Sequence, residues 1–281
     1  MRRDGVAAVA RISYTDWSLS VRRVACLPPF IGIDQEDSRL TIISLAPLDL
    51  AALMSSRICH DVISPVGAIV NGLEVLEDEK DADMRSVAMD LIKKSAISAS
   101  ARLQFCRLAF GAAGSLGALV DTGDAENVAR GLIGSERTTL RWNAQRRLAP
   151  KNAVKLLLNL CLIAAGAAPR GGILTVDLDG EGEALTMKVE AKGANVRLSH
   201  AAVTFLSGGP IETVDAHSIQ PYYTTLLARE CGMSIKASTA PDLVTLTAAR
   251  AADSGTLEHA SGPSTGLSSQ VESVGLANPA A

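Results

Sequence analysis

The feature that most constrains this chain is a pair of long apolar repeats at helical spacing, separated by a short acidic break. Apolar side chains recur every three or four residues from Leu48 to about Glu77, and again from Met84 to Phe110. The break supplies an aspartate, Asp81 or Asp83, that can cap a second helix. The sequence therefore predicts an antiparallel helical hairpin over residues 46–112. One buried stripe is expected to contain Leu48, Ala52, Ser55, Ile58, Val62, Val66, Ile69, Leu73 and Leu76.

A hairpin of two helices cannot bury such a broad apolar stripe by itself. Pairing two copies about a two-fold axis produces a four-helix bundle, a common solution for such hairpins. The pattern therefore predicts a homodimer held together by this bundle.

His60 lies roughly opposite the apolar stripe, on the polar side of the first predicted helix. Its neighbours on that side are polar or small, namely Ser56, Arg57, Ser64, Gly67 and Asn71. A histidine in this position is expected to face solvent and to be reachable by a partner protein. Cys59, at the edge of the stripe, is expected to serve packing.

A glycine-rich segment at 111–117 is predicted to be a linker, and residues 118–250 are predicted to form an α+β sandwich. Alternation in Leu174, Val176 and Leu178 indicates strands with one buried face. We expect helices on one side of a mostly antiparallel sheet. Expected strands are 138–143, 173–178, 184–191, 234–238 and 243–248, and expected helices are 124–133, 150–168, 200–206 and 221–231.

Composition excludes several classes of function. The 281 residues carry a formal net charge of −3, which gives no basic surface for nucleic acid. No apolar run approaches the roughly 20 residues of a membrane helix. The five cysteines form no C-x-x-C pair, so neither a disulfide framework nor a metal site is indicated. We expect a reduced, cytoplasmic protein whose residues 1–45 are disordered or a non-native extension, and whose residues 251–281 are a disordered tail.

The residues His60, Asp61 and Pro65 resemble the phosphoacceptor motif of two-component signalling, where His-Asp or His-Glu is followed by proline five residues after the histidine. Together with a hairpin and a sandwich, the motif is similar to that of the ChpT-type histidine phosphotransferases of alphaproteobacteria. The segments that carry the likeness are 57–65, 72–78 and 103–112, and the resemblance spans about Leu48 to Ala249. It implies a degenerate sandwich of the Bergerat or GHKL type.

Positions that bind nucleotide in histidine kinases have changed here. Asn159 resembles the first asparagine of the kinase Asn-box, but Ile163 stands where the magnesium ligand would be. Ala191 replaces the aspartate that reads adenine, and residues 218–221 contain no glycine to wrap phosphates. The resemblance therefore implies that this chain binds no cofactor or metal, and that a receiver partner supplies magnesium.

By the same resemblance, His60 takes a phosphoryl group from the receiver aspartate of a CckA-like hybrid histidine kinase. Response regulators of the CtrA-like and CpdR-like kinds are the implied acceptors. Asp61 is expected to orient the imidazole, with support from Arg57 and Ser64.

The expected receiver-binding residues are Ser56, Gly67, Asn71, Glu74 and Arg197; for Asn71 and Glu74 a plain solvated face is an equal alternative. Three other histidines, His200, His217 and His259, are expected to be ordinary surface or tail residues. An ATP-dependent sensor kinase and a non-catalytic scaffold that binds receivers remain alternative functions.

Overall fold

The computed structural model describes residues 44–111, 118–134, 137–209 and 213–250. The end segments that were expected to be disordered fall almost entirely outside these residues, as do the linker residues 112–117 and His259.

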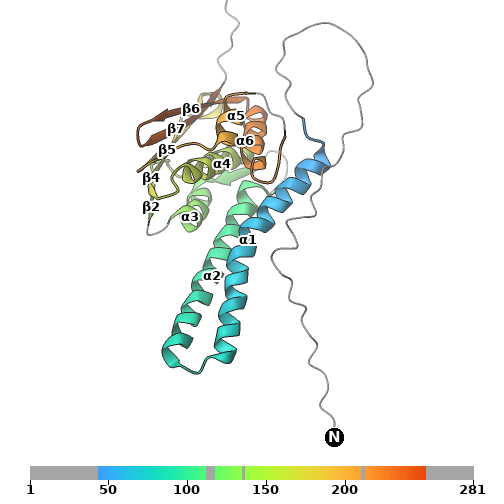
Figure 1. Cartoon of the computed structure of the whole chain (residues 1–281). Coiled ribbons are helices and arrows are strands. Elements are labelled where there is room, and N and C mark those ends of the chain that lie inside the picture. The colour runs from blue at the N-terminus through green and yellow to red at the C-terminus, as the bar shows by residue number, and fades with distance from the viewer. Residues whose placement is uncertain (1–43, 112–117, 135–136, 210–212, 251–281) are drawn as a thin grey trace, which may run out of the picture. The chain divides into compact units, whose positions relative to one another are not determined.

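Two long helices form the predicted hairpin, α1 over Pro47–Asp78 and α2 over Ala82–Ala109, which run side by side in Figure 1. Pro47 suits the first turn of α1, where a missing N–H costs no hydrogen bond. The Asp81 carboxylate caps α2 by accepting from the backbone N–H groups of Asp83 at 2.9 Å and Met84 at 3.0 Å. The hairpin and this cap are confirmed.

The buried face of α1 differs from the expected stripe. The residues it buries are Met54, Pro65 and Gly72, whereas Val66 and Leu73 are 44% and 48% exposed. None of the stripe residues is buried in the single chain, which agrees with the expectation that the hairpin cannot bury the stripe by itself, because one neighbouring helix covers only a narrow face of a long helix. At Gly72 the two helices approach closely, since an added Cβ there would lie 2.6 Å from Cγ1 of Ile92 on α2.

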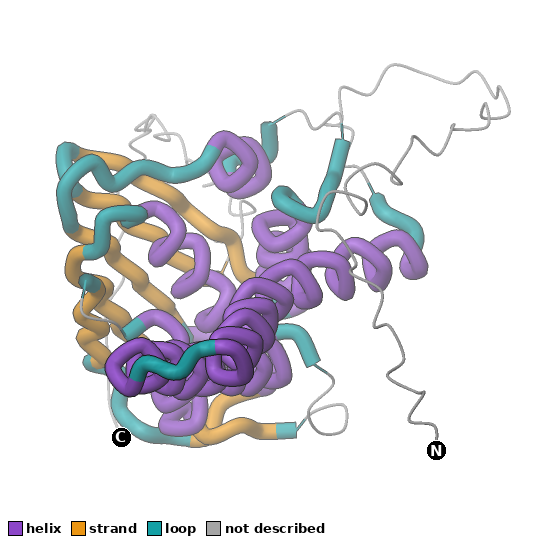
Figure 2. Tube along the Cα trace, turned by 60° about the horizontal axis from the view of Figure 1, so that its bottom comes forward, coloured by secondary structure: helices purple, strands orange, loops and turns teal. Residues whose placement is uncertain are grey.

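The sandwich follows the hairpin and has the expected architecture, with helices against one face of a mostly antiparallel sheet (Figure 2). Its sheet order is β2-β4-β5-β7-β6, and β2 and β4 pair in parallel while the other neighbours are antiparallel. The strands of this sheet are β2 Thr138–Trp142, β4 Gly172–Asp179, β5 Thr186–Lys192, β6 Met233–Ala240 and β7 Leu243–Arg250. The helices are α3 Thr122–Ile133, α4 Lys151–Ala167, α5 His200–Leu206 and α6 Ile219–Glu230, with a 3-10 turn, η1, at Gly182–Ala184.

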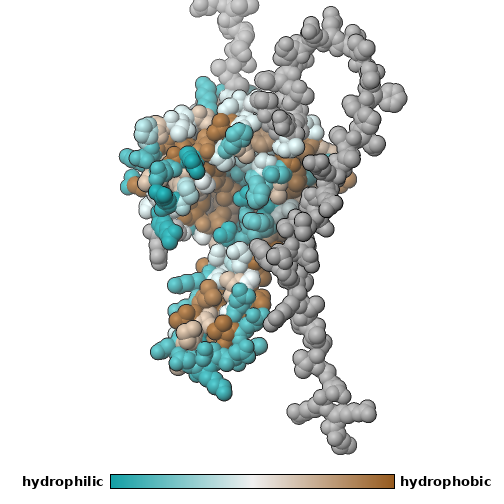
Figure 3. All heavy atoms as spheres, in the orientation of Figure 1, coloured by the Kyte–Doolittle hydropathy of each residue, from teal (hydrophilic) through white to brown (hydrophobic). Residues whose placement is uncertain are grey.

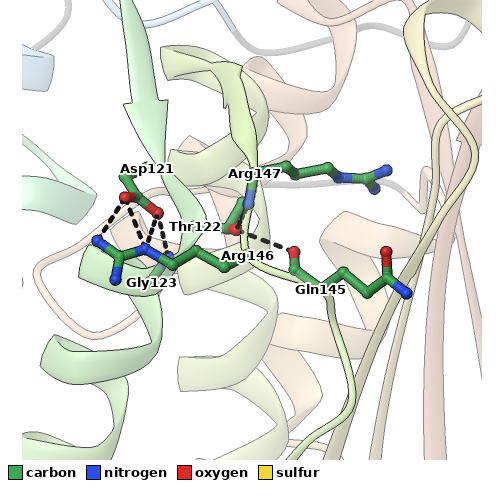
Figure 4. Close-up of polar contacts among 6 residues, drawn as sticks. All are labelled: Asp121, Thr122, Gly123, Gln145, Arg146 and Arg147. Atoms are coloured by element: carbon green, nitrogen blue, oxygen red, sulfur yellow. Dashed lines mark hydrogen bonds and ion pairs between the residues drawn. The ribbon is translucent and has the colours of Figure 1, made fainter.

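Two short strands, β1 Leu119–Asp121 and β3 Leu148–Pro150, form a separate antiparallel pair that the sequence did not predict. Side chains tie this pair to the start of α3 (Figure 4). Asp121 caps α3 through the Gly123 N–H and forms an ion pair with Arg146, while the Thr122 hydroxyl donates to the Gln145 carbonyl at 3.2 Å. Three-residue strands are too short to show an alternating pattern.

The main core lies between α4 and the sheet and includes the end of α2. Leu156, Leu158 and Leu160 of α4 are fully buried, as are Phe105 and Ala109 of α2. Burying each such large apolar side chain contributes about 1.5–3 kcal/mol of hydrophobic free energy. The end of the hairpin is therefore built into the sandwich core.

A second cluster, here called the joint cluster, connects the first half of α1 to α5 and α6. It consists of Met54, Phe205, Ile219 and Tyr222, and the Tyr222 hydroxyl also accepts from the Leu45 N–H at 3.1 Å. Because Met54 lies less than two helical turns before His60, this cluster holds the start of α6 close to that histidine.

Candidate functional site

His60 projects from α1 with 65% of its side chain exposed, as the sequence predicts. Its Nδ1 atom lies 3.5 Å from Oδ1 of Asp61, a separation longer than a good hydrogen bond. The contact leaves Nε2 as the ring nitrogen away from the carboxylate. Contacts of this kind commonly shorten when a reaction partner binds.

Arg57 holds Asp61 in place from one helical turn earlier. Its Nε donates to Oδ2 of Asp61 at 3.0 Å, so the two carboxylate oxygens face different partners. Both side chains are half-buried, which restricts their motion more than full exposure would. The three residues form a chain of contacts in which Arg57 fixes the carboxylate of Asp61 and that carboxylate faces the imidazole of His60.

Asp61 also lies near α2. Burial raises the pKa of the Cys106 thiol to about 11, and the negative charge of Asp61 adds to this effect. Cys106 is therefore a protonated thiol behind the site and is unsuited to nucleophilic chemistry near neutral pH. Cys59 differs from its expected packing role: it is exposed, because the helix that covers α1 lies on another face.

The remaining candidate residues of α1 lie on one open face with His60. Ser56, Ser64, Asn71 and Glu74 are all exposed, and an added Cβ at Gly67 would meet no atom within 4 Å. Successive turns of the helix thus leave room for a partner along this side. Arg197 is exposed on the sandwich, where its backbone N–H donates to the Ala167 carbonyl at the end of α4.

His217, which the sequence predicts to be an ordinary surface residue, lies beside His60. The centroids of the two imidazole rings are 6.0 Å apart and the rings meet edge to face, with an interplanar angle of 76°. The residue precedes α6, and no local pattern marks it as special. Only the packing of α6 against α1 through the joint cluster brings the two rings together.

The positions that resemble a nucleotide site are filled by core packing. Asn159 is fully buried, and its Nδ2 donates to the carbonyls of Lys155 at 2.9 Å and Ala109 at 3.3 Å, while Nε2 of Gln220 donates to its Oδ1 at 3.2 Å. Ile163 and Ala191 are also buried in the main core.

Within the residues that the structure describes, no group of three or more histidine, cysteine, aspartate or glutamate side chains is arranged to hold a metal ion. In the same residues, every helix is too short or too polar to span a membrane.

Comparison with known proteins defines the class of this molecule. Residues 122–242 match the family described as histidine phosphotransferase C-terminal domain. With the hairpin in front of that region, the chain is a protein phosphotransferase of the histidine type, which functions in a phosphorelay.

Two relatives are similar over most of the chain. The protein phosphotransferase ChpT of Brucella abortus (strain 2308) is 54% identical over 204 residues, which cover 72% of this chain and 96% of the relative. The solved structure described as a 1.7 Angstrom structure of a bacterial phosphotransferase is 50% identical, with a TM-score of 0.68 over 73% of this chain and 98% of that chain. This chain belongs to the ChpT family of protein phosphotransferases.

Proposed function

We propose that His60 is the phosphoacceptor, and that the protein carries a phosphoryl group from one receiver domain to another. The proposed donor is the receiver of a CckA-like hybrid histidine kinase, and the proposed acceptors are response regulators of the CtrA-like and CpdR-like kinds. The observation that supports this most strongly is the exposed imidazole of His60 with an oriented carboxylate at one of its two nitrogens.

In the proposed transfer the lone pair of His60 Nε2 attacks the phosphorus of a receiver aspartyl phosphate. An N–P bond forms as the P–O bond breaks, and the electron pair leaves with the receiver carboxylate. The ring then carries a positive charge with its proton on Nδ1, and the Asp61 carboxylate stabilises it. The onward step is the reverse reaction with a second receiver.

Together, Arg57 and Asp61 would keep the equilibrium between phosphorylated His60 and the receiver aspartyl phosphate from lying far to either side. The carboxylate favours the charged ring, while its ion pair with Arg57 at 3.0 Å limits its pull on the proton. A carrier must give up its phosphoryl group as readily as it accepts it. We also propose a supporting role for Ser64, one helical turn after His60, because its small side chain leaves space for the phosphoryl group beside the imidazole.

The proposed receiver-binding surface is the open face of α1 formed by Ser56, Gly67, Asn71 and Glu74. Arg197 of the sandwich is proposed as a separate contact. The small and polar side chains Ser56, Gly67 and Asn71 suit a docked receiver helix because they leave room for it, and Glu74 would suit a basic side chain of the receiver.

We propose that no ATP takes part and that the receiver supplies the magnesium ion. The support is chemical: Asn159 uses its side-chain amide within the core, and the side chains of Ile163 and Ala191 have no oxygen to offer at the positions that nucleotide chemistry requires. We propose the cytoplasm as its compartment, because the proposed receivers act there. ATP binding measured by calorimetry would instead favour the alternative of a sensor kinase.

We further propose a homodimer built from two hairpins. Exposed apolar side chains gather on the hairpin (Figure 3), and on α2 they include Val87, which is 63% exposed, and Leu91. Light scattering should show that Val87→Glu shifts a dimer toward monomer, because the change buries a charge in the bundle. Leu148→Glu, on the similarly exposed β3, is the matched control and should leave the dimer intact. A wild-type monomer at micromolar concentration would refute the proposal.

The decisive experiment incubates the protein with a CckA-like receiver domain carrying radiolabelled phosphate in the presence of Mg²⁺. Wild type should acquire an acid-labile, base-stable label that passes on to a CtrA-like receiver, and His60→Asn should acquire none. His200→Asn is the matched control, an exposed histidine on the sandwich, and should behave as wild type. Equal labelling of wild type and His60→Asn would refute His60 as acceptor. Receiver binding without any transfer would favour the scaffold alternative.

A further inference from the structure

His217 is the one other imidazole that lies in ring contact with His60 among the described residues. The centroid separation of 6.0 Å and the edge-to-face angle of 76° fall within the range of aromatic rings in direct contact. Both rings are exposed, so a group bound to His60 could reach His217. Nothing in the transfer described above uses this second ring.

The backbone around His217 is well held. Oδ1 of Asp215 accepts from the N–H of His217 at 3.0 Å, from the N–H of Ser218 at 2.8 Å and from the Ser218 hydroxyl at 2.7 Å. The next residue, Ile219, is fully buried in the joint cluster together with Met54 of α1. The hydrogen bonds to Asp215 before His217 and the buried Ile219 after it thus hold His217 in place relative to α1.

A phosphoryl group on His60 would enter a site where the one arginine of α1 is already paired. It carries roughly two negative charges near neutral pH and would lie close to the carboxylate of Asp61. On α1 the nearest cation is Arg57, and it donates to Asp61. A further hydrogen-bond donor from another element would therefore offset repulsion that α1 alone does not relieve.

We infer that His217 binds the phosphoryl group of phosphorylated His60, with one of its ring N–H groups donating a hydrogen bond to a phosphoryl oxygen. This inference rests on the proposed function of His60. It makes the sandwich a contributor to the phosphorylated site, through a residue that the joint cluster holds in place.

The consequence is a shift in how the phosphoryl group divides between the two proteins. A donor to phosphohistidine stabilises the charged carrier relative to the receiver aspartyl phosphate. Losing one charge-assisted hydrogen bond at an exposed position should move the equilibrium about three- to tenfold toward the receiver.

The test measures that equilibrium with a CckA-like receiver domain charged by acetyl phosphate in Mg²⁺, and reads phosphohistidine by ³¹P NMR. His217→Ala should shift the ratio three- to tenfold toward the receiver. His217→Phe keeps an aromatic ring without a donor and should shift it equally, whereas His217→Lys restores a cationic donor and should return it to within twofold of wild type. His200→Ala is the control and should have no effect.

A ratio for His217→Ala within twofold of wild type would overturn the inference, and so would full rescue by His217→Phe, which would assign the ring a packing role only. In both cases His60 still carries the phosphoryl group, so the proposed function survives. If wild type gains no phosphohistidine, or His60→Asn gains as much, the proposed function fails and this inference fails with it.

Discussion

Truncation of Asn159 is the sharpest test of whether the sandwich is a nucleotide site or a structural core. The side chain is fully buried and joins three helices by hydrogen bonds, to Lys155 of α4, Ala109 of α2 and Gln220 of α6. Asn159→Ala removes the donor to the Ala109 carbonyl. Nε2 of Gln220 keeps two acceptors, the Asn159 backbone carbonyl at 3.1 Å and the Thr224 hydroxyl at 3.3 Å.

The expected loss of stability follows from this count. One buried carbonyl deprived of its donor costs about 1–3 kcal/mol. The void left by the amide group adds about 1 kcal/mol. We therefore expect the free energy of unfolding to fall by about 2–4 kcal/mol, which lowers the Tm by roughly 5–15 °C for a folded region of this size.

Thermal and urea denaturation followed by circular dichroism would measure the change. Asn127→Ala on the exposed face of α3 is the matched control, and its Tm should stay within about 2 °C of wild type because its side chain is exposed. The structural role would be refuted if the Tm of Asn159→Ala stays within the same 2 °C of wild type, and if wild type binds ATP measurably while the variant does not. That result would instead support a nucleotide-binding role.

Three further predictions concern the site and its surroundings. Asp61→Asn should slow phosphoryl transfer to His60 about three- to tenfold in a rapid-quench assay without moving the site of labelling, and an unchanged rate would exclude Asp61 as the orienting group. The Ser218 hydroxyl and two backbone N–H groups lower the pKa of Asp215, so its contribution to stability is present above about pH 4 and lost as pH falls further. Thermal melts at pH 7 and pH 3 should therefore show a smaller pH dependence for Asp215→Asn than for wild type, and equal dependence would contradict this. Finally, iodoacetamide at pH 8 should alkylate exposed Cys59 in the native protein. It should reach Cys161 only after unfolding, because burial raises the pKa of that thiol to about 12. Mass spectrometry that shows both cysteines modified at equal rates in the native protein would contradict this prediction.

The helices could be predicted because their patterns are long. Apolar spacing over many turns identifies α1 and α2, and the capping aspartate Asp81 marks where the second begins. The buried side of α1 could not be predicted in the same way. Apolar residues on a long helix can pack against more than one neighbouring element. Sequence spacing does not show that Pro65 is covered in the chain while Val66 stays exposed.

The candidate site likewise contains residues that the sequence could identify and one that it could not. Arg57, His60 and Asp61 are close in sequence, so helix geometry alone places them together, and motif resemblance singles them out. His217 reaches His60 only because two distant residues, Met54 and Ile219, pack in one cluster. A contact that depends on such tertiary packing leaves no spacing signal in the chain.

Two of the connections between hairpin and sandwich explain how the sandwich would affect phosphoryl transfer at His60. One is the hydrogen bond from Asn159 to the carbonyl of Ala109 at the end of α2, and the other is the joint cluster around Met54 near the start of α1. Because the helices are antiparallel, both connections act at the same end of the hairpin, close to His60. A receiver at His60 would therefore meet a surface from two parts of the chain, and loosening either connection should weaken its docking while leaving the imidazole unchanged.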